Sequence, residues 1–139
     1  MSSTRGNLLV LQGGGPTPVL NASLFGVIDE ARSSAQFDRI LGARSGVVGL
    51  VGDDLLDLTT LAPADLERLR VTPGASLGST RHRLQESDLA NIIKVLDRRN
   101  VAALIVIGGN GSLRGAELIA EAVTRSGGKT CVVGVPKTI

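Results

Sequence analysis

Short apolar runs alternate along the chain with segments that carry apolar residues at helical spacing. Runs of four to eight apolar residues are typical of strands that are buried on both faces of a sheet. The sequence has four such runs, at residues 7–11, 39–43, 101–108 and 130–135. The last run contains Cys131, which we expect to be a small buried core residue. The pattern therefore predicts four buried strands.

Between these runs, apolar side chains recur at positions i, i+3, i+4 and i+7, in stripes that begin at Leu24, Leu89 and Ala116. This spacing predicts three helices, each with one apolar face. Asn21 is a suitable N-cap for the first helix, and Asn100 a suitable C-terminal end for the second. Because helices alternate with strands, neighbouring strands are expected to be parallel. The sequence thus predicts an α/β fold with a layered sheet.

The segment between residues 46 and 81 is the least regular part of the chain, although Pro63 is well placed to open a short helix. Neither an internal repeat nor a low-complexity linker divides the sequence. A length of 139 residues, with 42% hydrophobic and 20% charged residues, is ordinary for one globular domain. We therefore expect residues 1–139 to belong to a single domain.

Composition argues against several classes of function. The net charge of +2 comes from 15 basic and 13 acidic residues without a block of one sign, and the chain has two Phe, no Tyr and no Trp. Nucleic-acid binding therefore has little support. A single cysteine excludes a disulfide within the chain. The start of the chain lacks the apolar core of a signal peptide, and no apolar run approaches the roughly 20 residues of a membrane span. We expect a soluble, cytoplasmic protein that does not bind membranes.

Two glycine-rich loops follow the first and third predicted strands. Gly13, Gly14 and Gly15 come directly after the first strand, and the third strand runs into the sequence GGNGS at 108–112. In α/β sheets, ligands bind beyond the carboxyl ends of strands, where the exposed N–H groups of a following helix attract anions. The two loops therefore predict the two halves of a phosphate-binding site. Their spacing matches neither the dinucleotide nor the P-loop fingerprint, so glycines that serve only tight turns stay the alternative.

Five blocks of sequence resemble the phosphofructokinase family, in the order in which that family carries them. They cover essentially the whole chain, at residues 14–28, 42–50, 77–81, 106–116 and 134–139. The resemblance implies a Rossmann-like three-layer sandwich with a mostly parallel sheet. It also implies a glycolytic, homo-oligomeric 6-phosphofructokinase that transfers a phosphoryl group from ATP or pyrophosphate, with Mg²⁺, to the 1-hydroxyl of fructose 6-phosphate.

The resemblance also implies roles for individual residues. Gly14 and Gly15 match the loop whose backbone meets the donor phosphates, and Arg81 matches an arginine that contacts those phosphates; a guanidinium group suits phosphate oxygens. His82 is interpreted as a surface neighbour of this arginine rather than as an acid or base. A further four residues match the family's donor- and metal-binding element: Gly109, Asn110, Gly111 and Ser112.

Asn110 departs from the family pattern, in which an aspartate at this position anchors magnesium. An amide oxygen is still a possible Mg²⁺ ligand or a partner for one of its waters, but it brings no charge. Asn110 is therefore the predicted metal residue, with the ion depending more on the donor phosphates. Some members of the pyrophosphate-dependent branch also carry asparagine here.

The two donors are favoured by different residues. In the family, glycine at the position of Gly111 leaves room for ATP, whereas aspartate there selects pyrophosphate. Lys137 is typical of the pyrophosphate branch, and its ammonium group would stabilise charge on the transferring phosphoryl group with either donor. We predict ATP, because steric exclusion is a harder constraint than one additional cation. Thr138 is expected to reach the substrate.

Family members continue after the block at 134–139 with the aspartate that acts as catalytic base. The expectation is therefore that this chain is the N-terminal portion of a donor-binding domain, as a fragment or a broken gene product, and is inactive alone. A non-catalytic nucleotide- or phosphate-binding module, or a subunit that depends on a partner, is the alternative. A dinucleotide-dependent oxidoreductase is disfavoured, because Arg44 stands where an acidic ribose-binding residue is expected.

Overall fold

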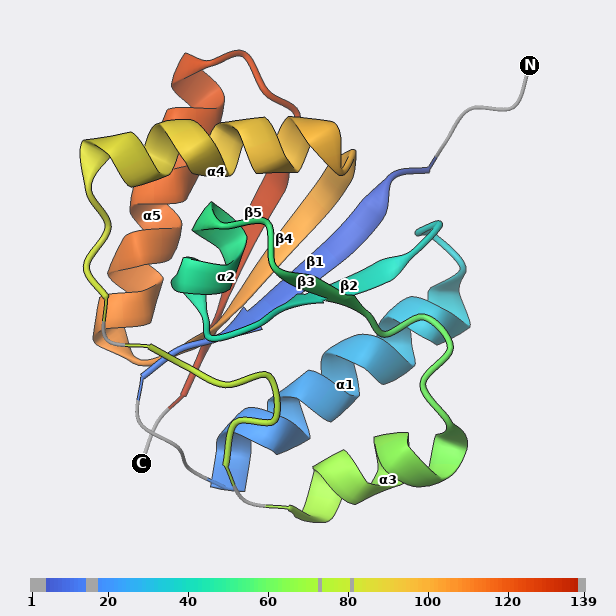
Figure 1. Ribbon diagram of the computed structural model, residues 1–139. Coiled ribbons are helices and arrows are strands. Elements are labelled where there is room, and N and C mark those ends of the chain that lie inside the picture. Colours follow the sequence, from blue (N-terminus) through green and yellow to red (C-terminus); the bar gives the residue numbers. More distant parts are fainter. Residues whose placement is uncertain (1–4, 15–17, 73, 81, 138–139) are drawn as a thin grey trace.

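Five strands form one sheet in the order β3-β2-β1-β4-β5 in the computed structural model, which describes residues 5–14, 18–72, 74–80 and 82–137 (Figure 1). All neighbouring strands are parallel except β3, which runs antiparallel to β2. Their bounds are β1 (Asn7–Gln12), β2 (Ile40–Ala43), β3 (Leu55–Asp57), β4 (Val101–Gly108) and β5 (Cys131–Pro136). The four predicted strands are confirmed to within one residue at each end. The three-residue β3 was not predicted, because its length is too short for a periodic pattern.

Helices cover both faces of this sheet, with α1 and α3 on one face and α2, α4 and α5 on the other (Figure 1). They are α1 (Pro18–Ser34), α2 (Val47–Val51), α3 (Pro63–Val71), α4 (Glu86–Arg98) and α5 (Asn110–Arg125). This arrangement confirms the three-layer α/β sandwich, and Pro63 opens α3 as predicted. Among the described residues, no helix is both long and apolar enough to cross a membrane.

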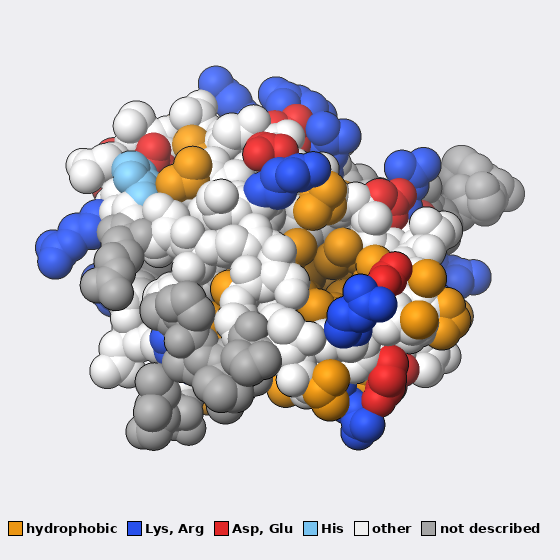
Figure 2. Space-filling view, turned by 60° about the horizontal axis from the view of Figure 1, so that its bottom comes forward, with side chains coloured by type: hydrophobic (Ala, Val, Ile, Leu, Met, Phe, Trp, Pro, Cys, Tyr) orange, Lys and Arg blue, Asp and Glu red, His pale blue; other side chains and the backbone are white. Residues whose placement is uncertain are grey.

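The two faces of the sheet bury separate hydrophobic clusters. Alternate residues of β1 enter opposite clusters: Leu9 and Leu11 pack toward α4 and α5, whereas Leu8 and Val10 pack toward α1. Such burial on both faces explains why the central strands are continuous apolar runs. On the α1 and α3 face, hydrophobic side chains reach the surface between charged ones (Figure 2).

Two sequence predictions are wrong in detail. Asn21 is not an N-cap: α1 begins three residues earlier at Pro18, and the Asn21 side chain is buried. Cys131 is exposed rather than buried, because β5 is an edge strand of the described sheet. The predicted end of the second helix is confirmed, since α4 ends at Arg98 and Asn100 has the left-handed φ of 50° that terminates helices.

Candidate functional site

The carboxyl ends of β1 and β4 lie side by side at the centre of the sheet. Gln12 pairs with Ile107 in the strand register, and the N–H of Gly13 donates to the carbonyl of Ile107 at 2.8 Å. The N–H of Lys137 donates to the carbonyl of Gly108 at 2.8 Å, which brings the end of β5 to the same edge. From here the chain enters α1 on one face and α5 on the other. This is the topological switch point at which open α/β sheets bind ligands.

Glycine is required where the two loops meet. A β-carbon at Gly13 would collide with the Ser112 hydroxyl, and one at Gly108 would lie 2.5 Å from the Ser112 β-carbon. Gly14 has a φ of +79°, which residues with a side chain rarely adopt. These glycines therefore allow the β1 loop to pack directly against the first turn of α5.

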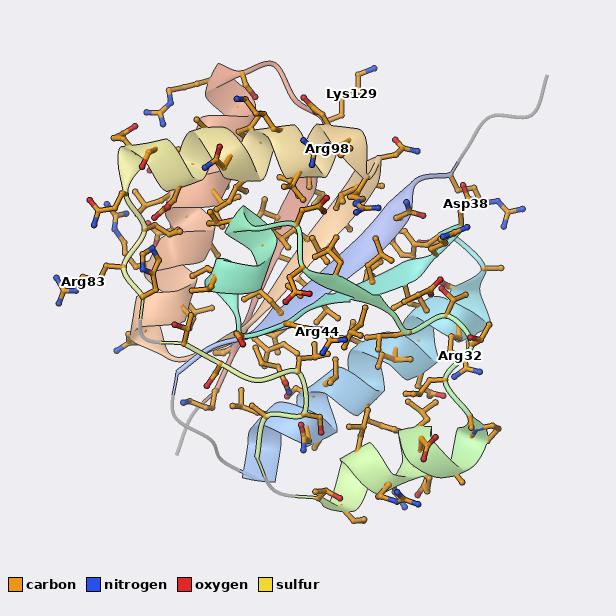
Figure 3. The ribbon with its side chains drawn as sticks, viewed as in Figure 1. Arg32, Asp38, Arg44, Arg83, Arg98 and Lys129 are labelled. Atoms are coloured by element: carbon orange, nitrogen blue, oxygen red, sulfur yellow. The ribbon has the colours of Figure 1, made fainter. Side chains whose placement is uncertain are left out.

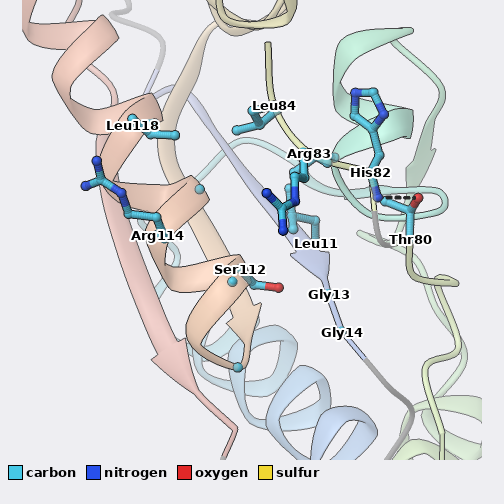
Figure 4. A pocket seen from close by; sticks show the side chains of 14 residues that line it. Leu11, Gly13, Gly14, Thr80, His82, Arg83, Leu84, Ser112, Arg114 and Leu118 are labelled. Carbon is cyan, nitrogen blue, oxygen red and sulfur yellow. Dashed lines mark hydrogen bonds between the residues drawn. The ribbon is translucent and has the colours of Figure 1, made fainter.

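The first turn of α5 presents N–H groups that have no partner within the helix at this junction. Gly109 is the N-cap, and the first intrahelical bond described runs from the N–H of Leu113 to the carbonyl of Gly109 at 2.9 Å. The turn contains no acidic residue, and no side chain of the described residues caps it. The Ser112 side chain points from α5 toward Gly13 (Figure 4). Free N–H groups, a favourable helix dipole and a hydroxyl group make this end of α5 suited to an anion.

A cavity of about 620 Å³ adjoins the loops, within the range of about 300–1,000 Å³ that small-molecule sites occupy. Glycine backbone and the side chains of Thr80 and Ser112 form one part of its wall (Figure 4). Apolar side chains form another part: Leu11, Val47, Leu84 and Leu118. None of the described residues that line the cavity is an aspartate or glutamate. The cavity thus combines an end whose chemistry suits an anion with an apolar wall.

Most of the predicted site residues that the structure describes are gathered here. Four line the cavity: Gly14, Gly109, Gly111 and Ser112. Asn110 is exposed in the first turn of α5. Lys137 reaches the β1 loop from the end of β5, since its Nζ would lie 2.9 Å from a β-carbon at Gly14. The predictions for Gly15, Arg81 and Thr138 lie outside the described residues.

Several cavity residues were not found from the sequence. Arg114, Gly115 and Leu118 follow Gly111 along one side of α5, and this i, i+3, i+4, i+7 spacing was the available signal. Arg83 comes from the segment between α3 and α4 and is exposed at the outer edge of the molecule (Figure 3). Two arginines therefore add positive charge to the cavity wall.

His82, the single histidine of the chain, fits its interpretation as a surface residue. Its side chain is 41% exposed, and its Nε2 lies 2.8 Å from Oδ2 of Asp88. Asp88 also accepts the N–H of Gln85 at 2.8 Å, in the first turn of α4. The hydrogen bond from His82, followed by that from Gln85, lowers the pKa of the Asp88 carboxyl. His82, which lines the cavity, is thus linked to α4 by its contact with Asp88.

The described residues do not form a Mg²⁺ site by themselves. Among them, no group of three or more His, Cys, Asp or Glu side chains could hold a metal ion. Asn110 offers one neutral amide oxygen, whereas protein Mg²⁺ sites use one or two carboxylates together with substrate phosphates. We therefore assign no chemical step to a metal ion.

Sequence comparison identifies relatives across nearly the whole chain. Residues 7–139 match the family Phosphofructokinase. The chain is 35% identical to the pyrophosphate–fructose 6-phosphate 1-phosphotransferase of Rhodospirillum rubrum, over 97% of this chain and 33% of the relative. It is 36% identical to the ATP-dependent 6-phosphofructokinase of Hamiltonella defensa, over 94% of this chain and 37% of the relative. The chain thus spans about one third of the length of these curated relatives.

Solved structures agree with this result. The pyrophosphate-dependent phosphofructokinase from Nitrosospira multiformis superposes with a TM-score of 0.91 at 30% identity, over 97% of this chain and 34% of the other. The corresponding enzyme from Marinobacter aquaeolei gives a TM-score of 0.89, also at 30% identity, over 96% and 33%. By sequence and by fold, the chain belongs to the phosphofructokinase family.

Proposed function

We propose that this chain supplies phosphoryl-donor-binding residues of a 6-phosphofructokinase, which transfers a phosphoryl group from ATP or pyrophosphate to the 1-hydroxyl of fructose 6-phosphate. One observation carries the proposal: the β1 loop, the first turn of α5 and Lys137 converge beside a cavity that no described carboxylate lines. Relatives of both donor types support it. The place of residues 1–139 within one donor-binding domain belongs to the same proposal.

The roles proposed for the described residues rest on their positions, and those of Arg81 and Thr138 rest on the family resemblance alone. Backbone N–H groups in the first turn of α5 and the backbone at Gly14 would hold the donor phosphates. The Lys137 ammonium group lies close enough to the β1 loop to stabilise charge on the transferring group. Arg81 would contribute a bidentate phosphate contact, and Thr138 would contact the acceptor.

We propose ATP as the donor. A β-carbon at Gly111 would have no heavy atom within 4 Å, so the space beside the phosphate end is open. The cavity continues from there along Leu84 and Leu118, which offer apolar surface to a nucleoside. Pyrophosphate has no apolar part that would use this surface. The position of Lys137 is compatible with either donor.

Fructose 6-phosphate as acceptor, a homo-oligomeric state and a cytoplasmic location are proposals drawn from the family alone. A non-catalytic binding module stays the second candidate, and one observation favours it for the isolated chain: no described residue that lines the cavity is a carboxylate able to take the proton of an acceptor hydroxyl.

Isothermal titration of the chain with ATP, pyrophosphate and NAD tests the proposal. Binding of ATP, with weaker binding of pyrophosphate and none of NAD, is the expected result. Binding of pyrophosphate alone would reverse the choice of donor. Binding of neither phosphoryl donor would contradict the proposed function, and binding of NAD alone would favour the oxidoreductase alternative.

A further inference from the structure

Two buried amide side chains lie behind the β1 loop. Gln12 is the last residue of β1, directly before Gly13, and is fully buried; Asn21 lies near the start of α1 and is 1% exposed. Burying an amide costs free energy unless its polar atoms find hydrogen-bond partners. The partners of these two side chains therefore indicate why amides occupy such positions.

Three of these partners follow α3 in the chain: Thr72, Ser76 and Leu77. The N–H of Leu77 donates to Oε1 of Gln12 at 3.0 Å, and the N–H of Ser76 donates to Oδ1 of Asn21 at 2.8 Å. Nδ2 of Asn21 donates to the carbonyl of Thr72 at 2.9 Å. Two side chains thus supply hydrogen bonds that a helix or sheet would otherwise provide to this backbone.

The amides also bond to each other and to α1. Nε2 of Gln12 donates to Oδ1 of Asn21 at 3.2 Å and to the carbonyl of Leu20 at 3.1 Å. Every oxygen and nitrogen of the two amide groups is therefore paired. A buried network in which every polar atom has a partner holds its members in one geometry, because displacement leaves a buried polar group without a partner.

The segment held by this network continues into the cavity wall. Two residues beyond Leu77, the Ser79 hydroxyl donates to the carbonyl of Gly14 at 2.8 Å, which links the segment to the β1 loop. Thr80, His82 and Arg83 then line the cavity. The segment is thus held by two sets of contacts: Gln12 and Asn21 bond to Leu77 and Ser76, and the β1 loop bonds to Ser79 through the carbonyl of Gly14.

We propose that Gln12 and Asn21 are positioning residues for the phosphoryl donor: they touch no donor themselves and set its affinity by holding Thr72 and residues 74–80 against the β1 loop. The inference rests on the proposed function. If Gln12 and Asn21 had only a structural role, their substitution would lower the stability of the fold without a specific effect on donor binding. The two roles are separable, because donor affinity and stability are measured independently.

The test compares Gln12→Met and Asn21→Leu, which replace each amide with an apolar side chain of similar size, with Ile92→Val and Ile92→Ala as controls. Ile92 is fully buried in the cluster on the opposite face of the sheet, so its variants lower stability without touching the network. Binding of ATP and inorganic pyrophosphate is measured by titration at a temperature where urea unfolding shows every variant to be folded. Both network variants should bind the donor about 10-fold more weakly, as losing a buried hydrogen bond implies.

The controls should change donor affinity less than about twofold at comparable stability. Donor binding by a network variant that equals binding by a control of the same stability would overturn the inference and leave the proposed function intact. A wild-type chain that binds neither donor would overturn both.

A second measurement needs no variant. Because coupling between two sites is reciprocal, saturating donor should slow hydrogen exchange at the amides of Ser76 and Leu77 in the wild-type chain. Donor binding that leaves exchange at these two amides unchanged would overturn the inference even if the network variants failed to fold.

Discussion

The ammonium nitrogen of Lys137 lies 2.9 Å from the point where a β-carbon of residue 14 would stand, so the absence of a side chain at Gly14 makes room for the cation. Gly14 also has a φ of +79°. Gly14→Ala should therefore lower the free energy of unfolding by about 1–2 kcal/mol, because a left-handed backbone disfavours a β-carbon. It should also displace Lys137 and weaken donor binding, which urea unfolding and titration would measure.

Gly26→Ala is the matched control for this substitution. Gly26 lies within α1, is exposed, and has no heavy atom within 4 Å of a built β-carbon. The same chemical change should there raise stability by about 0.5–1 kcal/mol and leave donor binding unchanged. Similar effects of the two alanines on donor affinity would contradict the role given to Gly14.

Gly111→Asp tests the choice of donor. The space beside Gly111 is open, and an acidic residue in the first turn of α5 should raise helix stability by about 0.3–1 kcal/mol, so the variant is expected to fold. The carboxylate should abolish ATP binding and leave pyrophosphate binding intact. Gly111→Ala, which adds a methyl group, is the control and should retain ATP binding. Equal affinity of the aspartate variant and the wild-type chain for ATP would refute steric selection.

Arg81→Ala tests the phosphate contact implied by the family resemblance. Loss of a charge-assisted contact should weaken donor binding by about 1–3 kcal/mol. Arg125→Ala, at the opposite end of α5 from the cavity, controls for the loss of one positive charge. Titration in the same buffer compares the two variants. If Arg81→Ala leaves donor affinity unchanged, Arg81 makes no phosphate contact, and its interpretation as a solvated arginine is favoured.

Asp53 should make stability depend on pH. Hydrogen bonds from Arg99, opposed by burial and assisted by Arg98, lower the pKa of the Asp53 carboxyl below its ordinary value of 3.8. A lowered pKa stabilises the fold at pH values above 3.8, and this contribution is lost as the pH falls through the folded pKa. Asp53→Asn should thus cost most stability near pH 7 and progressively less below about pH 4.

Asparagine, like aspartate, tolerates the positive φ of 57° at residue 53. Backbone strain should therefore not contribute to the difference in stability between Asp53→Asn and the wild-type chain. Asp54→Asn serves as control, since Asp54 is an exposed carboxylate 3.4 Å from Arg44 and such pairs contribute little. Urea unfolding at pH 7, 5 and 3 gives the stabilities. If Asp53→Asn lowers the free energy of unfolding by the same amount at all three pH values, the ion pairs of Asp53 do not cause the loss.

The isolated chain should bind a donor without transferring its phosphoryl group. No described residue that lines the cavity is a carboxylate, and Asp53 is held by Arg98 and Arg99 outside the set of cavity-lining residues. A coupled assay with fructose 6-phosphate, Mg²⁺ and each donor in turn checks this expectation against a heat-treated sample. Turnover well above that sample would mean that another residue of the chain serves as the base.

The fold was largely predictable because local pattern and tertiary position agree. The central strands are buried on both faces and so are continuous apolar runs, whereas β3 is too short to show a pattern. Asn21 was misassigned because a cap and a buried amide look alike until its distant partners, Thr72 and Ser76, are known. Cys131 was misassigned because apolar composition does not distinguish a central strand from the edge strand β5.

The candidate site was predictable where glycines mark it and less so elsewhere. Gly14 has a left-handed backbone and Gly111 has open space beside it, and glycine at both positions is visible in the sequence. Arg83 and Arg114 are ordinary surface residues by composition, and only the packing of the segment after α3 against α5 brings them to one cavity. Contacts between segments distant in the sequence have no local signal.

The central position of β1 also determines the order in which the molecule can be assembled during synthesis. One edge of β1 pairs with β2, which follows it closely in the sequence, with Leu8 beside Ile40. The other edge pairs with β4, which is synthesised much later, with Leu8 beside Ala103. At about 5–20 residues per second, ribosomes need several seconds to make the intervening chain. Throughout that time one edge of β1 has unpaired backbone N–H and C=O groups, which another strand could pair with wrongly. The junction between the β1 loop and α5 thus forms late, only after the partner strand has left the ribosome.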